Sequence, residues 1–181
     1  MRDLKHSALA VAVVASMALA GPARAETSDS GTLGLVDYAF IGQTNLGNQF
    51  QIESGKFGET HAGSDAVREY ARLMDTSHVQ VEQNLIALLH KMNVQPPPTS
   101  LLAGAYKSLI GTMARERGTA FDRDYVSSQL EYQNANDALY RWEIQNGSNV
   151  ELKTFARETL PRIDDHMHRV EALAAGSSSS R

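Results

Sequence analysis

Residues 64–93 read SDAVREYARLMDTSHVQVEQNLIALLHKMN, and this stretch decides the fold class. Its apolar residues recur every three or four positions, which is the period of an α-helix with one buried face. Ser64 is a favourable N-cap, and Pro96-Pro97-Pro98 follow the stretch and cannot continue a helix. The sequence therefore predicts a long amphipathic helix here. Its apolar stripe consists of Val67, Tyr70, Ala71, Met74, His78, Val81, Leu85, Leu88, Leu89 and Met92.

The helical period continues on both sides of this stretch, and strand-like alternation is not sustained anywhere. We expect one long helix before it, over about residues 33–58. A short helix over about residues 100–115 should follow it. Two more long helices are expected, over about residues 119–146 and 148–175.

The lengths of the connections predict how these helices are arranged. Short loops near His61 and Gly147 make the first two long helices antiparallel, and likewise the last two. The middle connection is long and carries the short helix, so it can cross the bundle. The predicted fold class is all-α: a ferritin-like four-helix bundle with a short crossover helix, in one domain over residues 33–175.

Local signals mark several helix ends. Thr119 with Asp122, and Ser148 with Glu151, have the spacing of a capping box, so we expect them to open the third and fourth long helices. Pro161 lies inside the fourth and should bend it, because its backbone nitrogen has no hydrogen to donate. The first helix contains five glycines, which either permit close packing or mark a break: Gly34, Gly42, Gly47, Gly55 and Gly58.

Residues 1–25 have the layout of a secretory signal peptide. They combine a basic start, an apolar run from Ser7 to Ala20, and small residues in Ala23-Arg24-Ala25. We expect cleavage after Ala25, since the apolar run is shorter than the roughly 20 residues that span a bilayer; a retained N-terminal anchor is the alternative. The mature chain would then be periplasmic or peripherally associated with the envelope, with a flexible N-terminus over residues 26–32 and a disordered tail over residues 176–181.

Composition narrows the function classes. The 181 residues include 17 Lys and Arg, 21 Asp and Glu and no Cys, for a net charge of −4, and residues 26–181 alone carry −6. An acidic chain lacks the basic face of a nucleic-acid binder, so no nucleic-acid partner is expected. The missing cysteines exclude disulfides, a thiol nucleophile and cysteine-ligated metals. No phosphate-binding loop or nucleophile elbow is found, and no stretch after the first 25 residues is long enough to span a membrane.

One polar residue falls on the inward stripe of each long helix: Gln51, His78, Gln133 and His166. One interpretation is a buried polar network that fixes helix register, because a buried amide or imidazole without a partner costs about 1–3 kcal/mol. The other is a metal site with His78 and His166 as nitrogen ligands, for which Fe, Zn or Mn are the candidate ions. Partial exposure of these side chains is a third alternative.

A di-iron carboxylate centre requires a Glu from two helices and Glu-x-x-His from the other two. The closest matches are Asp75 with His78 and Asp165 with His168, but aspartate is shorter than glutamate. His168 also lies about 200° around its helix from His166, away from the apolar stripe. We therefore do not expect a di-iron centre.

Three motifs resemble one bacterial family. They are residues 67–74 with Ser77-His78, residues 121–126, and Leu160-Pro161 with His166. Over about residues 37–173 the chain resembles an exported domain of unknown function that is usually labelled "predicted outer membrane protein". The resemblance implies a ferritin-like fold and export, and no established reaction. Such proteins typically have Glu where this chain has Gln51, and His where it has Gln133.

Taken together, these patterns predict an exported helical bundle without catalytic residues, acting as a structural or interaction module of the cell envelope. The partner is not specified by the sequence, and peripheral association with the envelope is compatible with it. The alternative is a ferritin-like bundle that binds a metal or a small ligand through its core histidines. A membrane-surface module that uses the glycine-rich first helix is a third hypothesis.

Overall fold

The computed structural model describes residues 33–95 and 100–178, which contain helices and no β-strand element. Four helices are long and one is short, so the all-α prediction is confirmed for the described residues. An isolated bridge between Ala62 and Gly118 is the one β-type contact among them. The helices are α1 Leu35–His61, α2 Asp65–Lys91, α3 Ser100–Met113, α4 Gly118–Asn146 and α5 Val150–Ser178.

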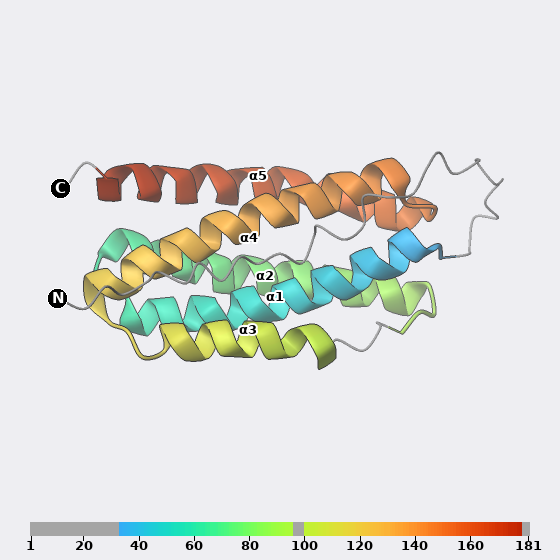
Figure 1. Cartoon of the computed structure of the whole chain (residues 1–181). Coiled ribbons are helices and arrows are strands. Elements are labelled where there is room, and N and C mark those ends of the chain that lie inside the picture. The colour runs from blue at the N-terminus through green and yellow to red at the C-terminus, as the bar shows by residue number, and fades with distance from the viewer. Residues whose placement is uncertain (1–32, 96–99, 179–181) are drawn as a thin grey trace.

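The helices form a bundle of two antiparallel hairpins, α1 with α2 and α4 with α5 (Figure 1). The most extensive packing is within each hairpin, and α1 against α4 and α2 against α5 join the two. Helix α3 runs back along the outside of the bundle beside α1, so that α2 and α4 point in the same direction (Figure 1). The middle connection therefore crosses the length of the bundle, as its length predicted.

The buried apolar residues form two clusters, one toward each end of the bundle. One contains Phe50, Val67, Phe121 and Tyr125. The other contains residues such as Leu85. Along α2 and α5 the buried polar side chains fall between members of the two clusters. Together with the buried amides of α1 and α4 they form what we call the polar layer: Asn48, Gln51, Ser77, His78, Gln129, Gln133 and His166.

The glycines of α1 permit close packing and do not break the helix. A Cβ at Gly55 would lie 2.7 Å from the backbone oxygen of Ala71 on α2. A Cβ at Gly58 would collide with the Ala71 side chain, and one at Gly47 would meet the Tyr132 hydroxyl at 2.5 Å. The two helices of the first hairpin therefore approach more closely than larger residues would allow.

Ser64 caps α2 as predicted, and its side chain accepts from the backbone nitrogen of Val67 at 3.3 Å. The predicted cap of α4 is wrong, because α4 begins at Gly118 and its N-cap Arg117 makes no side-chain cap bond. The predicted cap of α5 is also wrong, because the Asn149 side chain accepts from Leu152 N at 3.0 Å. Ser148, and Asp122 of the box predicted around Thr119, instead bond to distant segments: Ser148 donates to Asp37, and Asp122 accepts from Gly63 N and Ser64 N.

Several expected boundaries differ from the structure or lie outside it. Helix α1 continues to His61 and α5 to Ser178, past the expected ends at residues 58 and 175. Helix α5 is continuous across Pro161. The expected signal peptide and flexible N-terminus (residues 1–32), the three prolines and the last residues of the tail fall outside the described residues.

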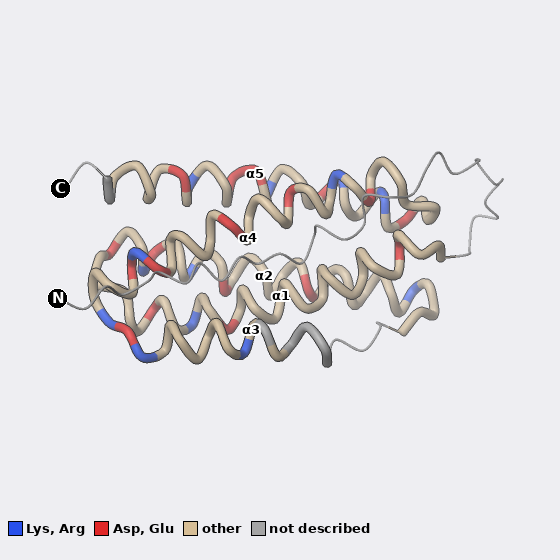
Figure 2. Tube along the Cα trace, viewed as in Figure 1, with Lys and Arg blue, Asp and Glu red and all other residues tan. Residues whose placement is uncertain are grey.

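Charged residues of both signs are distributed along the four long helices, and none of these described helices carries a stripe of a single sign (Figure 2). A mixed group lies at the turn between α3 and α4, where Arg115, Glu116 and Arg117 are consecutive. Within the described part of the chain, no helix is at once long enough and apolar enough to cross a bilayer.

Candidate functional site

The four polar side chains predicted on inward stripes are all buried in the bundle. Gln51 on α1 and Gln133 on α4 are 0% exposed, and His78 on α2 and His166 on α5 are 2% and 1% exposed. The two imidazole rings face each other with their centres 5.4 Å apart and their planes tilted by 42°. The structure thus brings the two histidines together in the polar layer.

Gln51 pairs with a residue that the sequence did not single out. Its Nε2 donates to Gln129 Oε1 at 3.0 Å, and Gln129 Nε2 donates back to Gln51 Oε1 at 2.9 Å. Gln129 is also 0% exposed and lies one helical turn before Gln133. This reciprocal amide pair joins α1 to α4.

Each histidine has one partnered ring nitrogen. His78 Nδ1 lies 2.8 Å from Asn48 Oδ1 on α1, and His166 Nε2 lies 3.0 Å from Ser77 Oγ on α2. Burial lowers the pKa of His166 to about 4 and holds the pKa of His78 well below its ordinary value. Both imidazoles are therefore neutral near pH 7, which is the form that binds metals.

Gln133 contacts a second group in the polar layer. Its Nε2 donates to Tyr70 Oη at 3.3 Å and lies 3.3 Å from Met74 Sδ, so it joins α4 to α2. Tyr70 Oη in turn donates to the backbone oxygen of His166 at 3.4 Å. Burial raises the pKa of Tyr70, so its hydroxyl stays protonated in the physiological range.

The described residues contain no group of three or more His, Cys, Asp or Glu side chains that could hold a metal ion. Both residues of the Asp165 and His168 pair are exposed, and so are Glu53 and Glu131 on the other helices. Within the predicted set of four, His78 and His166 are the residues whose ring nitrogens could bind a metal ion. Gln51 and Gln133 would place amide groups near such an ion.

A second buried polar cluster, which the sequence did not reveal, lies where α1 begins beside the α4–α5 loop. Asp37, 0% exposed, accepts from the backbone nitrogens of Gly34 at 2.6 Å, Ser148 at 3.0 Å and Asn149 at 3.1 Å. The Ser148 hydroxyl also donates to it. Burial works to raise the pKa of Asp37, but these hydrogen bonds outweigh it, so the pKa is lowered and the carboxylate is ionised.

Glu143 completes this cluster, which we call the Asp37 clasp: Gly34, Asp37, Glu143, Ser148 and Asn149. Its carboxyl is 0% exposed, and neither oxygen accepts a hydrogen bond from the described residues. Burial, together with the neighbouring Asp37 carboxylate, raises the pKa of Glu143 to about 8. At neutral pH the clasp is thus a protonated acid beside an ionised one.

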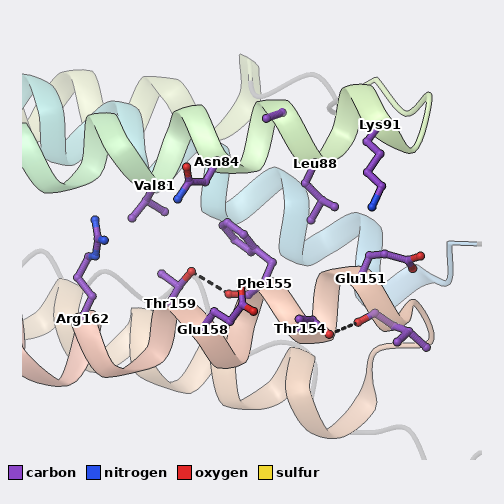
Figure 3. Close-up of a pocket in the computed structure, with 12 residues that line it drawn as sticks. Val81, Asn84, Leu88, Lys91, Glu151, Thr154, Phe155, Glu158, Thr159 and Arg162 are labelled. Atoms are coloured by element: carbon purple, nitrogen blue, oxygen red, sulfur yellow. Dashed lines mark hydrogen bonds between the residues drawn. The ribbon is translucent and has the colours of Figure 1, made fainter.

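A groove lies between α2 and α5 (Figure 3), with a volume of about 490 Å³. Val81, Leu88 and Phe155 contribute apolar surface to it. Lys91 and Arg162 lie toward opposite ends (Figure 3). We call it the α2–α5 groove.

A family model described as a domain of unknown function, DUF4142, matches residues 22–173, which include every residue of the polar layer and of the Asp37 clasp. The chain belongs to the DUF4142 family. The resemblance of the three motifs to a domain of unknown function is thereby confirmed at the level of the family. No curated protein and no solved structure matches this DUF4142 chain.

Sequence reasoning about this DUF4142 member missed the partners of its polar residues. Asn48 and Gln129 lie on apolar stripes, so periodicity could have indicated their burial. Ser77 precedes His78 directly, and small polar residues at such positions give little signal. Ser148 and Asn149, which donate to Asp37, lie 111 and 112 positions away in sequence. Glu143 stands among polar residues that resemble a solvated face.

Proposed function

We propose that this chain is an exported, ferritin-like helical bundle that acts as a non-catalytic structural or interaction module of the cell envelope. The observation that carries the proposal is the pairing of the buried polar layer. Gln51 with Gln129 joins α1 to α4, and Asn48 with His78 joins α1 to α2. Similar bonds join α2 to α5 and α2 to α4.

Such pairs support a role in architecture rather than in catalysis. Each one fixes the axial position of one helix against another, because a slipped helix would leave two buried polar groups without partners. General acid–base chemistry would need a titrating group that a substrate can reach. The two histidines are enclosed and neutral, and Asp165, the carboxylate that acts on His166 among the described residues, is exposed.

The path of the chain supports the ferritin-like part of the proposal. Two antiparallel hairpins joined by a long connection that returns the chain along the bundle is the connectivity of ferritin-like folds. Here α3 provides that return, so α2 and α4 run in the same direction (Figure 1).

The export part rests on residues 1–25, whose layout is that of a signal peptide. The test is expression of the full chain in a Gram-negative host, followed by osmotic shock, a high-salt wash of the membranes and mass spectrometry of the recovered protein. We expect a chain that begins at Glu26, in the shock fluid or in the salt wash. As a matched control, Ala23→Leu should block cleavage and Ser28→Leu should not, since only Ala23 occupies a position that the peptidase reads. A full-length chain confined to the cytoplasm contradicts the proposal.

A further inference from the structure

The two core histidines each present a ring nitrogen that has no partner. Asn48 Oδ1 can only accept from His78, so His78 carries its hydrogen on Nδ1 and has a bare lone pair on Nε2. Nε2 is buried and finds no partner among the described residues. The Ser77 hydroxyl can donate to or accept from His166 Nε2, so this contact is compatible with either tautomer. In the tautomer that carries its hydrogen on Nε2, His166 Nδ1 has a bare lone pair, and it finds no partner among the described residues.

Hydrogen bonds on the far side of each ring are what a metal-ligating histidine requires, because they fix the tautomer and the orientation of the ring. Asn48 on α1 plays this part for His78, and Ser77 on α2 plays it for His166. The two rings have centres 5.4 Å apart and are nearly fully buried, and each has a nitrogen without a hydrogen-bond partner. A purely structural network would pair its buried polar atoms, so these two nitrogens need another explanation.

A soft donor, Met74, lies one helical turn from His78. Met74 precedes His78 by one turn on the same face of α2 and is 0% exposed. Its sulfur is 3.3 Å from Gln133 Nε2, which places it in the polar layer. Gln133 also has a buried side-chain oxygen without a partner.

The charge of this donor set selects the ion. Imidazole, thioether and amide are all neutral, and the charged groups that act on His166 are Asp165, Arg162 and Arg169, of which the first favours a cation and the other two oppose it. All three are exposed. The cost of burying an ion grows with the square of its charge, so a divalent ion without a carboxylate counter-charge is strongly disfavoured here. Imidazole and thioether together are typical ligands of Cu(I).

The α2–α5 groove extends toward this layer. Arg162, at one end of the groove, precedes His166 by one turn and donates to the backbone oxygen of Ser77 at 3.4 Å. Val81, also in the groove, follows His78 by one turn (Figure 3). The groove therefore ends one helical turn from both imidazoles.

We propose that His78, His166 and Met74 bind one soft monovalent cation, Cu(I), in the interior of the bundle. The proposal replaces the Fe, Zn or Mn that the sequence suggested for His78 and His166, and it goes beyond the architectural role proposed above. The architectural role is tested by export of the chain and by the helix-joining pairs, and the result of the metal experiment does not affect it.

The test uses the purified protein and three ions: Cu(I) held under anaerobic conditions in competition with a chromogenic chelator, Ag(I) as a redox-inert substitute, and Zn(II). We expect one Cu(I) or Ag(I) per chain by native mass spectrometry, and weaker binding of Zn(II). His166→Leu should weaken Cu(I) binding by about 100-fold and Met74→Leu by about 10-fold. His168→Leu, which changes an exposed histidine two positions from His166, should leave the affinity unchanged.

A second readout keeps the test valid if a histidine variant fails to fold. In the unaltered protein, Ag(I) should shift the ¹⁵N signals of His78 Nε2 and His166 Nδ1, while those of the exposed His90 and His168 stay in place. The proposal is overturned by shifts at His90 or His168 alone, by tighter binding of Zn(II) than of Cu(I), or by no bound ion at all.

Discussion

At the scale of single residues, the most consequential group outside the polar layer is Glu143. It is a fully buried carboxyl beside the ionised Asp37, and its pKa of about 8 reflects burial first, then its hydrogen bond with Asp37 and the Asp37 charge. Because a protonated carboxyl can donate a hydrogen bond where a second carboxylate would repel, the proton on Glu143 is part of the Asp37 clasp.

This arrangement predicts how stability depends on pH. Glu143 titrates near its ordinary value of 4.5 in the unfolded chain and near 8 in the folded one, so the folded state binds the extra proton between these values. Stability contributed by Glu143 is therefore complete below pH 4.5 and is lost as the pH rises toward 8, by up to about 1.4 kcal/mol per pH unit. Glu143→Gln keeps a donor and cannot ionise, so urea unfolding across this range should show a flatter pH profile.

The matched control is Glu151→Gln, which removes an exposed carboxyl near the start of α5. It should leave the pH profile of the unaltered protein in place. Identical profiles for Glu143→Gln and the unaltered protein would mean that Glu143 is not the buried acid described here.

The Gln51–Gln129 pair gives a second prediction at this scale. Gln51→Leu alone or Gln129→Leu alone leaves one buried amide without its partner, and each should lower the free energy of unfolding by about 1–3 kcal/mol. The double variant replaces both amides by apolar groups of similar size and should recover much of that loss. Chemical denaturation of the four proteins measures the coupling; strictly additive losses would contradict the role of this pair in holding α1 against α4.

At the scale of elements, replacing a glycine by alanine should have opposite effects on stability in α1 and in α3. An alanine is intrinsically better than glycine inside a helix by about 0.5–1 kcal/mol. At Gly111 a Cβ would meet nothing within 4 Å, whereas at Gly58 it would collide with Ala71. The higher helix propensity of alanine can therefore stabilise α3 at position 111 but not α1 at position 58.

We expect Gly111→Ala to raise the free energy of unfolding slightly and Gly58→Ala to lower it by about 1–3 kcal/mol, because the extra methyl group forces α1 away from α2. Thermal unfolding followed by circular dichroism compares the two variants. A Gly58→Ala protein as stable as the unaltered one would show that the first hairpin is packed less closely than described.

The helices themselves could be predicted from the sequence, but the pairing of residues between helices could not. The period of the apolar residues predicted the five helices, because burial of one face is a local pattern. It could not tell whether Gln51 would meet Gln129 or Gln133, since these lie one turn apart and the choice depends on the axial offset of α1 against α4. The caps at Ser148 and Thr119 were wrong for a related reason: Ser148 donates to Asp37 and Asp122 accepts from another loop, and neither distant partner is visible in the local sequence.

At the scale of the whole molecule, α3 differs from the four long helices. It lies on the outside of the bundle, and its contacts are mainly to α1 and α4, including the stacked rings of Tyr106 and Phe50 with centres 4.6 Å apart. Of its described side chains, Ile110 and Met113 are the buried ones. Few buried apolar contacts imply a low free energy of local opening.

Amide hydrogen exchange should therefore show α3 opening more readily than α2 or α5. Tyr106→Ala should speed exchange in α3 further while exchange in α2 stays the same, because the stacked pair holds α3 to α1. Exchange of α3 and α2 at the same rate, in both proteins, would mean that α3 opens only when the whole bundle unfolds.

The two turns are each completed by the opposite hairpin. Asp37 of the first hairpin accepts from the amides of Ser148 and Asn149 in the second, and Asp122 of the second accepts from Gly63 and Ser64 in the first, both at 2.8 Å. A hairpin that forms alone leaves its turn with amides that no nearby side chain satisfies. Each hairpin therefore supplies the hydrogen-bond acceptor that completes the turn of the other. An intermediate with one folded hairpin lacks these bonds, so docking of the two hairpins should be cooperative.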